Sequence, residues 1–446
     1  ISGNVAGMPE QAWIAQLRAS EYDPGTLWMV VNNYRKGDFN PYLFQTTDFG
    51  KTWQNLTKNK GIKGYALSVI QDPQVPELVF LGTENGLWIS GDSGDAWVQF
   101  KNDFPSVSTM DLAIQKRESA LIVGTFGRAI WVLDDLKSLR EIVVGNLNPV
   151  LTALPVNDAV QVRGLFIAPP GNIWTGFNTT FEGENRPFQQ VELPFYLFAP
   201  VSDSETLKAV ITHSDKREIK VIEKTELVQG LNYLSWKLDE NSEFLLGSWV
   251  TDETRYIPVV PGTYTIKFIY GNHSDETTIN ILSDPRFPEN RQVDIALNTY
   301  QRAVNVLVRR MNQNMNALNK RMELIDKIRT HFEKENNLDF FKSIEQIREK
   351  ITGIKQNAKP SALGRQTGAW QSFDTTVWSQ LNSVLEIAAA RLQGISVQDE
   401  EQLKNATFLI EQFENELNHF IRNDWKSFES LVNKKGHSWF GALSDY

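Results

Sequence analysis

An eight-residue phrase occurs twice near the start of this 446-residue chain. It reads TTDFGKTW from Thr46 to Trp53 and SGDSGDAW from Ser90 to Trp97. Both copies place a hydroxyl residue first, Asp third, Gly fifth and Trp eighth, and the two Asp residues lie 44 positions apart. Repetition at a period of about 20–50 residues indicates a chain built from similar small units, such as the blades of a β-propeller.

Short apolar runs fill the sequence around the two phrases. Gly, Asn, Asp and Pro residues separate one run from the next, as in strands joined by tight turns. Two runs also repeat, because GTENGLWIS begins at Gly82 and GTFGRAIWVL begins at Gly124. The predicted strands cover residues 26–31, 41–44, 66–70, 77–83, 86–90, 121–125 and 129–133. We therefore predict propeller blades over residues 1–140, although about three repeats are visible and a closed propeller needs about four to eight.

The next region is rich in strands but does not repeat. Its strand-like runs cover residues 192–198, 207–212, 218–224, 231–238, 262–270 and 276–282. Tyr264, Ile266, Phe268 and Tyr270 alternate along one run and therefore share a face. Six or seven strands at this spacing predict one antiparallel β-sandwich over residues 150–284.

The hydrophobic period becomes helical between residues 288 and 435. A heptad seam predicts one long helix that packs against antiparallel neighbours. The seam consists of Val304, Val308, Met311, Met315, Leu318, Met322 and Ile325. Further predicted helices cover residues 338–356, 375–393 and 397–432, which suggests a four-helix bundle followed by a tail at 436–446. Ser396 and Asp399 have the spacing of a capping box.

Composition and charge exclude several classes of function. The net charge of −9 opposes binding to nucleic acids and anionic membranes. The absence of cysteine excludes disulfides, thiol nucleophiles and zinc–thiolate sites. No apolar run reaches about 18 residues, so no transmembrane segment is predicted. The five histidines form no metal-binding motif and no Gly-rich phosphate loop occurs, so we expect neither a metal nor a cofactor.

The segments PYLFQTTDFGKTW, LVFLGTENGLWISGDSGDAW and GTFGRAIWVLDDL resemble the Asp-box (BNR-repeat) blades of bacterial sortilin-like proteins, which are often labelled glycosyl hydrolases. The segments GLNYLSWKLDE, PVVPGTYTIKFIYG and SDPRF are similar to the immunoglobulin-like sandwich of that family, which a helical region follows. The resemblance covers nearly all of the chain. It implies a multidomain β-then-α fold, with a partial propeller, an immunoglobulin-like sandwich and a C-terminal α-helical bundle. It also implies a secreted or cell-surface protein with further blades upstream of Ile1.

The physical chemistry of the repeated phrase favours a structural role. An Asp carboxylate can accept backbone N–H bonds in a tight turn, a hydroxyl can bond the backbone across it, and Gly supplies a positive φ. The tryptophan would pack beneath the turn. We assign this role to Thr46, Asp48, Gly50, Trp53, Ser90, Asp92, Gly94 and Trp97. Repetition argues against catalysis by these carboxylates, because a catalytic Asp is needed once whereas each blade needs its own turn.

Three other residues are candidates for binding. Arg128 stands in TFGRAIW, where it can bind a ligand or pair with Asp134 or Asp135 between blades. Trp174 and Trp370 lie in Gly-rich loops, where a tryptophan can stack on a sugar, anchor a partner or fill a junction between domains. No catalytic residue is assigned, because the 54 carboxylates do not select a facing pair.

The sequence therefore predicts a secreted or cell-surface binding or scaffold protein. Its propeller would recognise a protein, a peptide or a glycan. One alternative is a glycoside hydrolase with a sialidase-like or endo-glucanase-like propeller, whose catalytic residues lie mostly upstream of this chain. A second alternative is an accessory subunit of an outer-membrane uptake or secretion complex.

Overall fold

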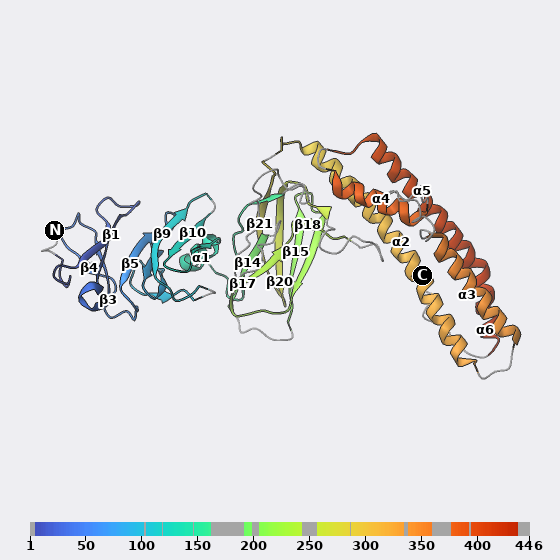
Figure 1. Cartoon of the computed structure of the whole chain (residues 1–446), viewed down its shortest axis with the longest axis horizontal. Helices are drawn as coiled ribbons and strands as arrows, with labels where there is room; N and C mark the ends of the chain where they lie inside the picture. Colours follow the sequence, from blue (N-terminus) through green and yellow to red (C-terminus); the bar gives the residue numbers. More distant parts are fainter. Residues whose placement is uncertain are drawn as a thin grey trace.

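The chain contains a stack of sheets, a second group of sheets and a helical region, in that order (Figure 1). This β-rich organisation with a helical C-terminal region was predicted from the sequence and is confirmed. The computed structural model describes residues 5–101, 104–117, 119–145, 147–161, 191–198, 205–242, 257–285, 287–333, 338–358, 376–391 and 394–435.

The first group consists, within these described residues, of three antiparallel sheets whose strands are paired in sequence order. The first sheet contains β1 (Trp13–Ala19), β2 (Leu27–Asn33), β3 (Asp38–Thr46) and β4 (Gln54–Asn55). The second contains β5 (Ala66–Gln71), β6 (Val79–Thr83), β7 (Gly86–Ser90) and β8 (Val98–Gln99). The third contains β9 (Thr109–Gln115), β10 (Ala120–Thr125) and β11 (Ile130–Leu133).

The three sheets pack face to face around two hydrophobic clusters. Trp28 and Val30 of the first sheet contact Leu81 and other residues of the second. Phe80, on the opposite face of the same strand as Leu81, packs with Leu121 of the third sheet. The second sheet is therefore covered on both faces, which explains why all five residues of its strand β6 are buried.

Four strands of the stack, β1, β4, β8 and β9, and one helix were not predicted from the sequence; β4 and β8 have two residues each. Strand β1 reads WIAQLRA, and its polar side chains bond neighbouring sheets: Gln16 accepts the Val69 N–H at 2.7 Å, and Arg18 donates to the Leu112 carbonyl at 3.1 Å. Strand β9 reads TMDLAIQ and is largely exposed. Neither strand therefore shows the apolar alternation by which a strand is usually recognised.

Helix α1 (Leu136–Val144) is fastened to the second sheet by a buried ion pair. The Arg140 guanidinium binds both carboxylate oxygens of Asp72, at 2.9–3.1 Å, and also Gln74 and Ser119, each at 3.0 Å. Asp72 is fully buried and Arg140 nearly so. The pair therefore ties a local helix to a turn 68 residues earlier in the chain.

The second group of strands forms two main sheets around one core. The first contains β12 (Leu151–Ala153), β14 (Val191–Leu197) and β17 (Gly230–Trp236). The second contains β13 (Ala159–Gln161), β21 (His273–Ser283), β20 (Gly262–Tyr270), β15 (Leu207–His213) and β16 (Glu218–Lys224). A short pair, β18 (Asp239–Glu240) and β19 (Ile257–Pro258), adjoins them.

The core of this group forms between the two main sheets. Phe195 of one sheet and Phe268 of the other lie with ring centroids 5.1 Å apart. The alternating residues of β20 from Tyr264 to Tyr270 are all buried in this core, so the predicted shared face is confirmed. The pairing is antiparallel except for β13, which runs parallel to β21.

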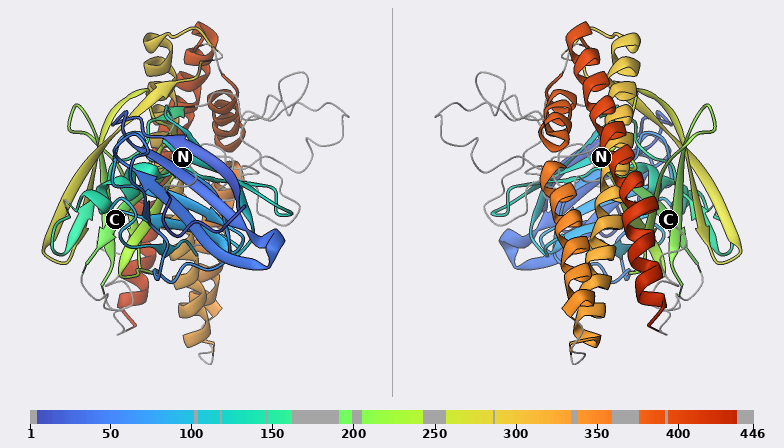
Figure 2. Two further views of the ribbon diagram at one scale, coloured as in Figure 1. Left: turned by 90° about the vertical axis from the view of Figure 1, so that its left-hand side faces the viewer. Right: turned by 90° about the vertical axis from the view of Figure 1, so that its right-hand side faces the viewer.

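The helical region matches the predicted elements closely. Its helices are α2 (Arg291–His331), α3 (Leu338–Ala358), α4 (Val377–Ala390), α5 (Val397–Phe420) and α6 (Lys426–Asn433). The predicted seam residues all lie in α2 and pack in the shared core, six of them buried and Met322 partly buried. The capping box at Ser396 is also confirmed. Helices α2 and α5 run side by side in both views of Figure 2.

The helix predicted over residues 397–432 contains one irregularity. A π-helical turn at Ile421–Trp425 lies between α5 and α6, and the chain stays helical through it. At this turn the buried Arg321 of α2 lies 5.4 Å from the ring centre of Trp425. None of the helices described is long and apolar enough to cross a membrane.

Candidate functional site

The first repeated phrase folds into a turn after β3 that is held by hydrogen bonds between its own residues. One oxygen of Asp48 accepts the backbone N–H of Thr52 at 2.8 Å and the hydroxyl of Thr46 at 2.9 Å. The other oxygen accepts the Thr52 hydroxyl at 2.7 Å. The Thr46 hydroxyl oxygen accepts the Gly50 N–H at 2.9 Å, and the Trp53 indole donates to the Gly50 carbonyl at 3.2 Å.

The second phrase repeats this arrangement after β7. Asp92 accepts the Ala96 N–H at 2.8 Å and the Ser90 hydroxyl at 2.7 Å, and the Gly94 N–H donates to Ser90 at 2.7 Å. The Trp97 indole donates to the Gly94 carbonyl at 3.1 Å and reaches the Leu56 carbonyl of the first sheet at 3.0 Å. The two phrases, called here the Asp turns, therefore have one hydrogen-bond pattern.

Backbone conformation explains why glycine occupies the fifth position of each Asp turn. Gly50 has a φ of 82° and Gly94 a φ of 97°, values that L side chains rarely adopt. In addition, a Cβ atom on Gly94 would lie 2.9 Å from the Leu56 side chain. The fifth position of the phrase is thus restricted by local geometry.

The hydrogen bonds of the turn keep its aspartate ionised. The backbone N–H of Thr52 and then the Thr52 hydroxyl lower the pKa of Asp48 to about 2. The pKa of Asp92 is also lowered, because the Ala96 N–H and the Ser90 hydroxyl outweigh the effect of burial. Carboxylates held in this way are poor proton donors near neutral pH.

The opposite end of the sheet stack carries a different set of residues. The Asp turns follow β3 and β7, whereas the preceding turns, β2–β3 and β6–β7, lie at the other end because the strands are antiparallel. The β10–β11 turn and the residues just before β5 and β9 meet there as well. This second end presents a group of planar side chains.

Five residues from the first two sheets form a cluster that we call the aromatic end: Trp13, Tyr34, Arg35, Phe39 and Tyr65. Tyr34 and Tyr65 stack with centroids 4.5 Å apart and an interplanar angle of 19°. The Arg35 guanidinium lies 5.5 Å from the Trp13 ring centre and 5.8 Å from that of Tyr34. Phe39 is tilted beside Tyr65 at 6.3 Å. The planar groups thus form a ladder across two sheets.

Backbone hydrogen bonds extend this end across the third sheet. The Glu84 N–H donates to the Tyr65 carbonyl at 3.0 Å, and the Ser108 hydroxyl donates to the Glu84 carbonyl at 3.3 Å. The Phe126 N–H then donates to the Ser108 carbonyl at 2.9 Å. Burial and the nearby Glu84 raise the pKa of the Tyr65 hydroxyl, so it stays protonated. The turns of three sheets are therefore joined into one surface.

Arg128 lies at this same end, in the β10–β11 turn. Its side chain is exposed, and its carbonyl accepts the Trp131 indole N–H at 2.8 Å. Asp135, one of the two partners suggested from the sequence, caps helix α1 by accepting the Ser138 N–H at 3.0 Å. The other two sequence candidates, Trp174 and Trp370, lie outside the described residues.

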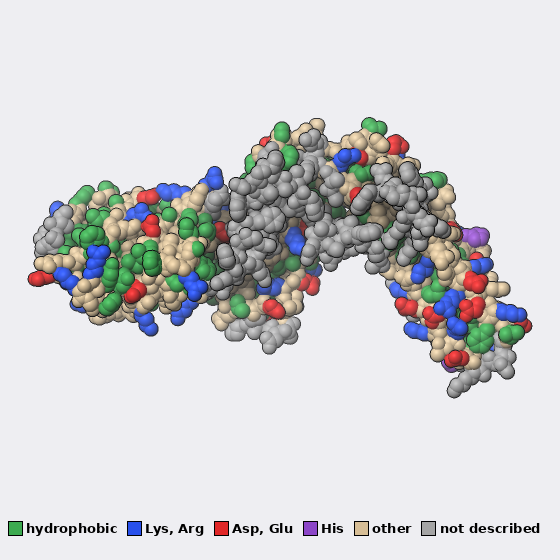
Figure 3. All heavy atoms as spheres, viewed as in Figure 1, with side chains coloured by type: hydrophobic (Ala, Val, Ile, Leu, Met, Phe, Trp, Pro, Cys, Tyr) green, Lys and Arg blue, Asp and Glu red, His purple; other side chains and the backbone are tan. Residues whose placement is uncertain are grey.

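The aromatic end was missed in the sequence because its members come from separate segments. Tyr34, Arg35 and Phe39 occur in NNYRKGDF, between two predicted strands, while Trp13 begins β1 and Tyr65 precedes β5. An aromatic and basic turn segment was the available signal. Figure 3 shows hydrophobic side chains gathered over the N-terminal sheets, whereas charged side chains of both signs cover the distal part of the helical region.

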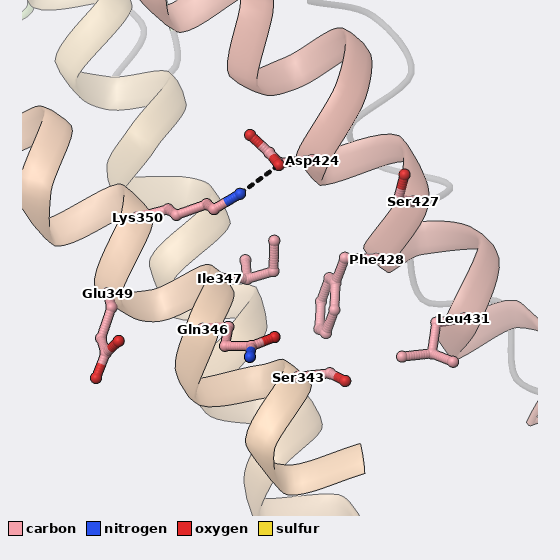
Figure 4. A pocket seen from close by; sticks show the side chains of 9 residues that line it. All are labelled: Ser343, Gln346, Ile347, Glu349, Lys350, Asp424, Ser427, Phe428 and Leu431. Carbon is pink, nitrogen blue, oxygen red and sulfur yellow. Dashed lines mark hydrogen bonds and ion pairs between the residues drawn. The ribbon is translucent and has the colours of Figure 1, made fainter. Parts of the chain in front are cut away.

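A pocket lies between α3 and the C-terminal helices (Figure 4). It has a volume of about 780 Å³ and an apolar base that includes Ile347 and Phe428. Lys350 and Asp424 form an ion pair across it. Its lining is completed by Ser343, Gln346, Glu349, Ser427 and Leu431. The pocket thus combines two hydroxyls, an amide, the Glu349 carboxylate and an ion pair around an apolar base.

Metal chemistry has no support in the described part of the chain. No group of three or more His, Asp or Glu side chains in that part could hold a metal ion.

Comparisons with known proteins assign no family. No family model matches the sequence, and no curated protein matches it. Among solved structures, the chain is similar to the GH74 xyloglucanase from Xanthomonas campestris, with 10% identity and a TM-score of 0.24, over 59% of this chain and 38% of that one. An ancestral GH74 enzyme gives 11% identity and a TM-score of 0.24, over 60% and 35%. Both similarities are weak, and each spans well under half of the enzyme concerned.

Proposed function

We propose that this chain is a binding protein whose N-terminal sheets are blades of a β-propeller and whose aromatic end is the recognition surface. The observation that carries the proposal is the cluster of planar side chains at one end of the stack, where Tyr34 stacks on Tyr65 and Arg35 lies beside Trp13. At this end, Trp13, Phe39 and Phe126 are 61%, 55% and 77% exposed. The Asp-turn end also exposes a ring, that of Phe49. The carboxylates of Asp48 and Asp92 are already bonded within their own turns. Exposed aromatic side chains and arginines are typical of recognition surfaces.

The Asp turns have a structural role in this proposal. The Asp-box resemblance supports it, and so does the equivalence of their hydrogen bonds. Each turn closes the outer part of a blade. Residues 1–140 would form the blades, 150–284 an immunoglobulin-like sandwich and 288–435 a helical bundle, with a tail at 436–446. The sandwich and bundle would act as spacer or docking modules, and the resemblance supports a secreted or cell-surface setting.

The proposal is tested by binding of the whole chain to arrays of oligosaccharides and of peptides. Tyr65→Ala should abolish binding, because it removes the ring that joins the first sheet to the second at the aromatic end. Phe49→Ala is the matched control, since Phe49 is 76% exposed but lies in an Asp turn at the opposite end. Unchanged thermal unfolding would show that both variants are folded.

Two outcomes would contradict this function. The first is the absence of binding to either array. The second is binding that Phe49→Ala removes and Tyr65→Ala leaves intact, which would move recognition to the other end of the stack. Assaying the bound oligosaccharides for newly formed reducing ends separates this function from the glycoside hydrolase alternative, because a binding protein leaves the glycan uncut.

A further inference from the structure

We infer that the ligand of the aromatic end is a neutral oligosaccharide, which stacks on Trp13 and Phe39. This inference rests on the proposed function, since it names the ligand class of the same surface. It starts from the positions of the exposed apolar side chains on the sheet stack. The exposed rings of Trp13, Phe39 and Phe126 are at or beside the turns of one end. Exposed aliphatic side chains, Ile14 and Ile130, lie beside the same turns and add apolar surface to this end.

Exposed aromatic rings suit a sugar ligand better than they suit a protein partner. A pyranose presents a patch of C–H bonds on one face, and the electron-rich face of an aromatic ring attracts such weakly positive hydrogens. A protein partner is usually held by side chains that fill pockets on its surface. The aromatic end, in contrast, offers side chains that are flat.

The ladder also holds these side chains in place before any ligand arrives. Tyr34 is stacked on Tyr65, and Arg35 lies between the rings of Trp13 and Tyr34. Tyr65 is fixed in turn by its carbonyl, which accepts the Glu84 N–H. Groups that are already ordered lose less conformational entropy on binding, and this favours weak, shallow ligands such as oligosaccharides.

Polar groups around the rings can bond the hydroxyls of a sugar. Arg35 and Asn85 are exposed, and Glu84 is half-buried beside Tyr65. Together they offer donors and acceptors, which a sugar hydroxyl needs because it is both.

Charge favours a neutral sugar over a polyanionic one. Lys36 donates to the Glu10 backbone carbonyl and the Gln11 side-chain oxygen, and Asp38 accepts bonds from Asn40 and Tyr42, so both charged groups are hydrogen-bonded within the chain. Arg35 and Glu84 are of opposite sign. With a net charge of −9, the whole chain would also repel an anionic glycan.

The experiment measures binding of the whole chain to cellohexaose, mannohexaose and chitohexaose by isothermal titration calorimetry. Hexagalacturonate serves as the anionic probe. At least one neutral hexasaccharide should bind, and hexagalacturonate should not. Trp13→Ala and Phe39→Ala should each raise the Kd by about tenfold or more, which is the loss expected for one stacked ring. Trp13→Tyr should recover part of the affinity, and Phe49→Ala should bind like the unchanged chain.

The possible results separate this inference from the function on which it rests. If no neutral hexasaccharide binds, or if Trp13→Ala and Phe39→Ala bind normally, the inference is overturned. If peptides bind instead, and Tyr65→Ala abolishes that binding, the proposed function survives with a different ligand. If neither sugars nor peptides bind, both statements fail. If hexagalacturonate binds more tightly than the neutral hexasaccharides, the inference is overturned, because the ligand would be an anionic oligosaccharide.

Discussion

The hydroxyl that opens each Asp turn has three hydrogen-bond roles. In the second turn, the Ser90 oxygen accepts the N–H groups of Gly94 and Asp92 and donates to the Asp92 carboxylate. Thr46 does the same in the first turn. Because Ser and Thr alternate at this position, the turn requires the hydroxyl and tolerates an extra methyl group.

Ser90→Ala should therefore lower the free energy of unfolding by about 1–3 kcal/mol, because the N–H of the buried Gly94 loses its acceptor. Ser90→Thr, which copies the first turn, should cost much less. Urea denaturation of the two variants measures the difference. Equal stability of Ser90→Ala and Ser90→Thr would show that the hydroxyl is dispensable.

The lowered pKa of Asp48 leads to a second prediction, about the pH dependence of stability. Its pKa is lowered from about 4 in an unfolded chain to about 2 in the folded turn. A carboxylate with a depressed pKa contributes stability above about pH 4 and loses it as the pH falls to about 2. Asp48→Asn should thus be less stable than the unchanged chain at pH 7, and the gap should narrow below pH 4. A gap in urea midpoint that stays constant from pH 7 to pH 3 would contradict the assignment.

The elements of the stack depend on long-range polar contacts as well as on apolar packing. Helix α1 is short, yet its Arg140 is buried against Asp72, Gln74 and Ser119. Removing one partner of a buried pair leaves an uncompensated charge. The pair therefore determines where α1 lies on the second sheet.

Arg140→Met should lower the free energy of unfolding by about 3–5 kcal/mol, because Asp72 would keep a buried charge without its partner. Glu141→Gln changes the neighbouring charge on α1 and serves as the control. The double variant Arg140→Met with Asp72→Asn should lose less than the sum of the two single changes. Additive losses in urea denaturation would show that the two residues do not act as a pair.

How far each element could be predicted depended on what its side chains contact. The strands that bury apolar residues, such as β6 and β20, were found from their apolar runs and the turn residues around them. The strand β1 was not, because Gln16 and Arg18 bind the backbone of other sheets. The same reason applies to the aromatic end. Its residues are ordinary turn and strand-entry residues until the fold brings Tyr34 onto Tyr65.

At the scale of the whole molecule, the three parts meet through small polar joints. Asn157 donates to the Asp134 carbonyl at 2.9 Å between the stack and the middle sheets. Between the middle sheets and the helices, the buried Glu240 accepts bonds from Arg217, at 2.7 and 3.0 Å, and from Asn298, at 3.0 Å. The second joint is the stronger, because a buried carboxylate is bonded from both sides.

Glu240→Gln should weaken this second joint, because Arg217 then loses a charged acceptor. We expect a loss of about 1–3 kcal/mol and a thermal transition that separates into two steps as the sheets and helices uncouple. Glu218→Gln, an exposed change on the nearby β16, is the control. Scanning calorimetry distinguishes the outcomes, and a single unshifted transition in Glu240→Gln would argue against this role.

The π-helical turn between α5 and α6 has a consequence for the helical residues that follow it. Buried residues there are Phe413, Leu417, Phe420, Trp425, Phe428 and Val432. Successive buried residues on one face of an α-helix are three or four positions apart, but Phe420 and Trp425 are five apart. The one extra residue rotates the helix that follows by about 100° about its axis. Without it, Phe428 and Val432 would face water. The length of the segment between Phe420 and Trp425, more than the identity of its residues, therefore decides which face of α6 is buried.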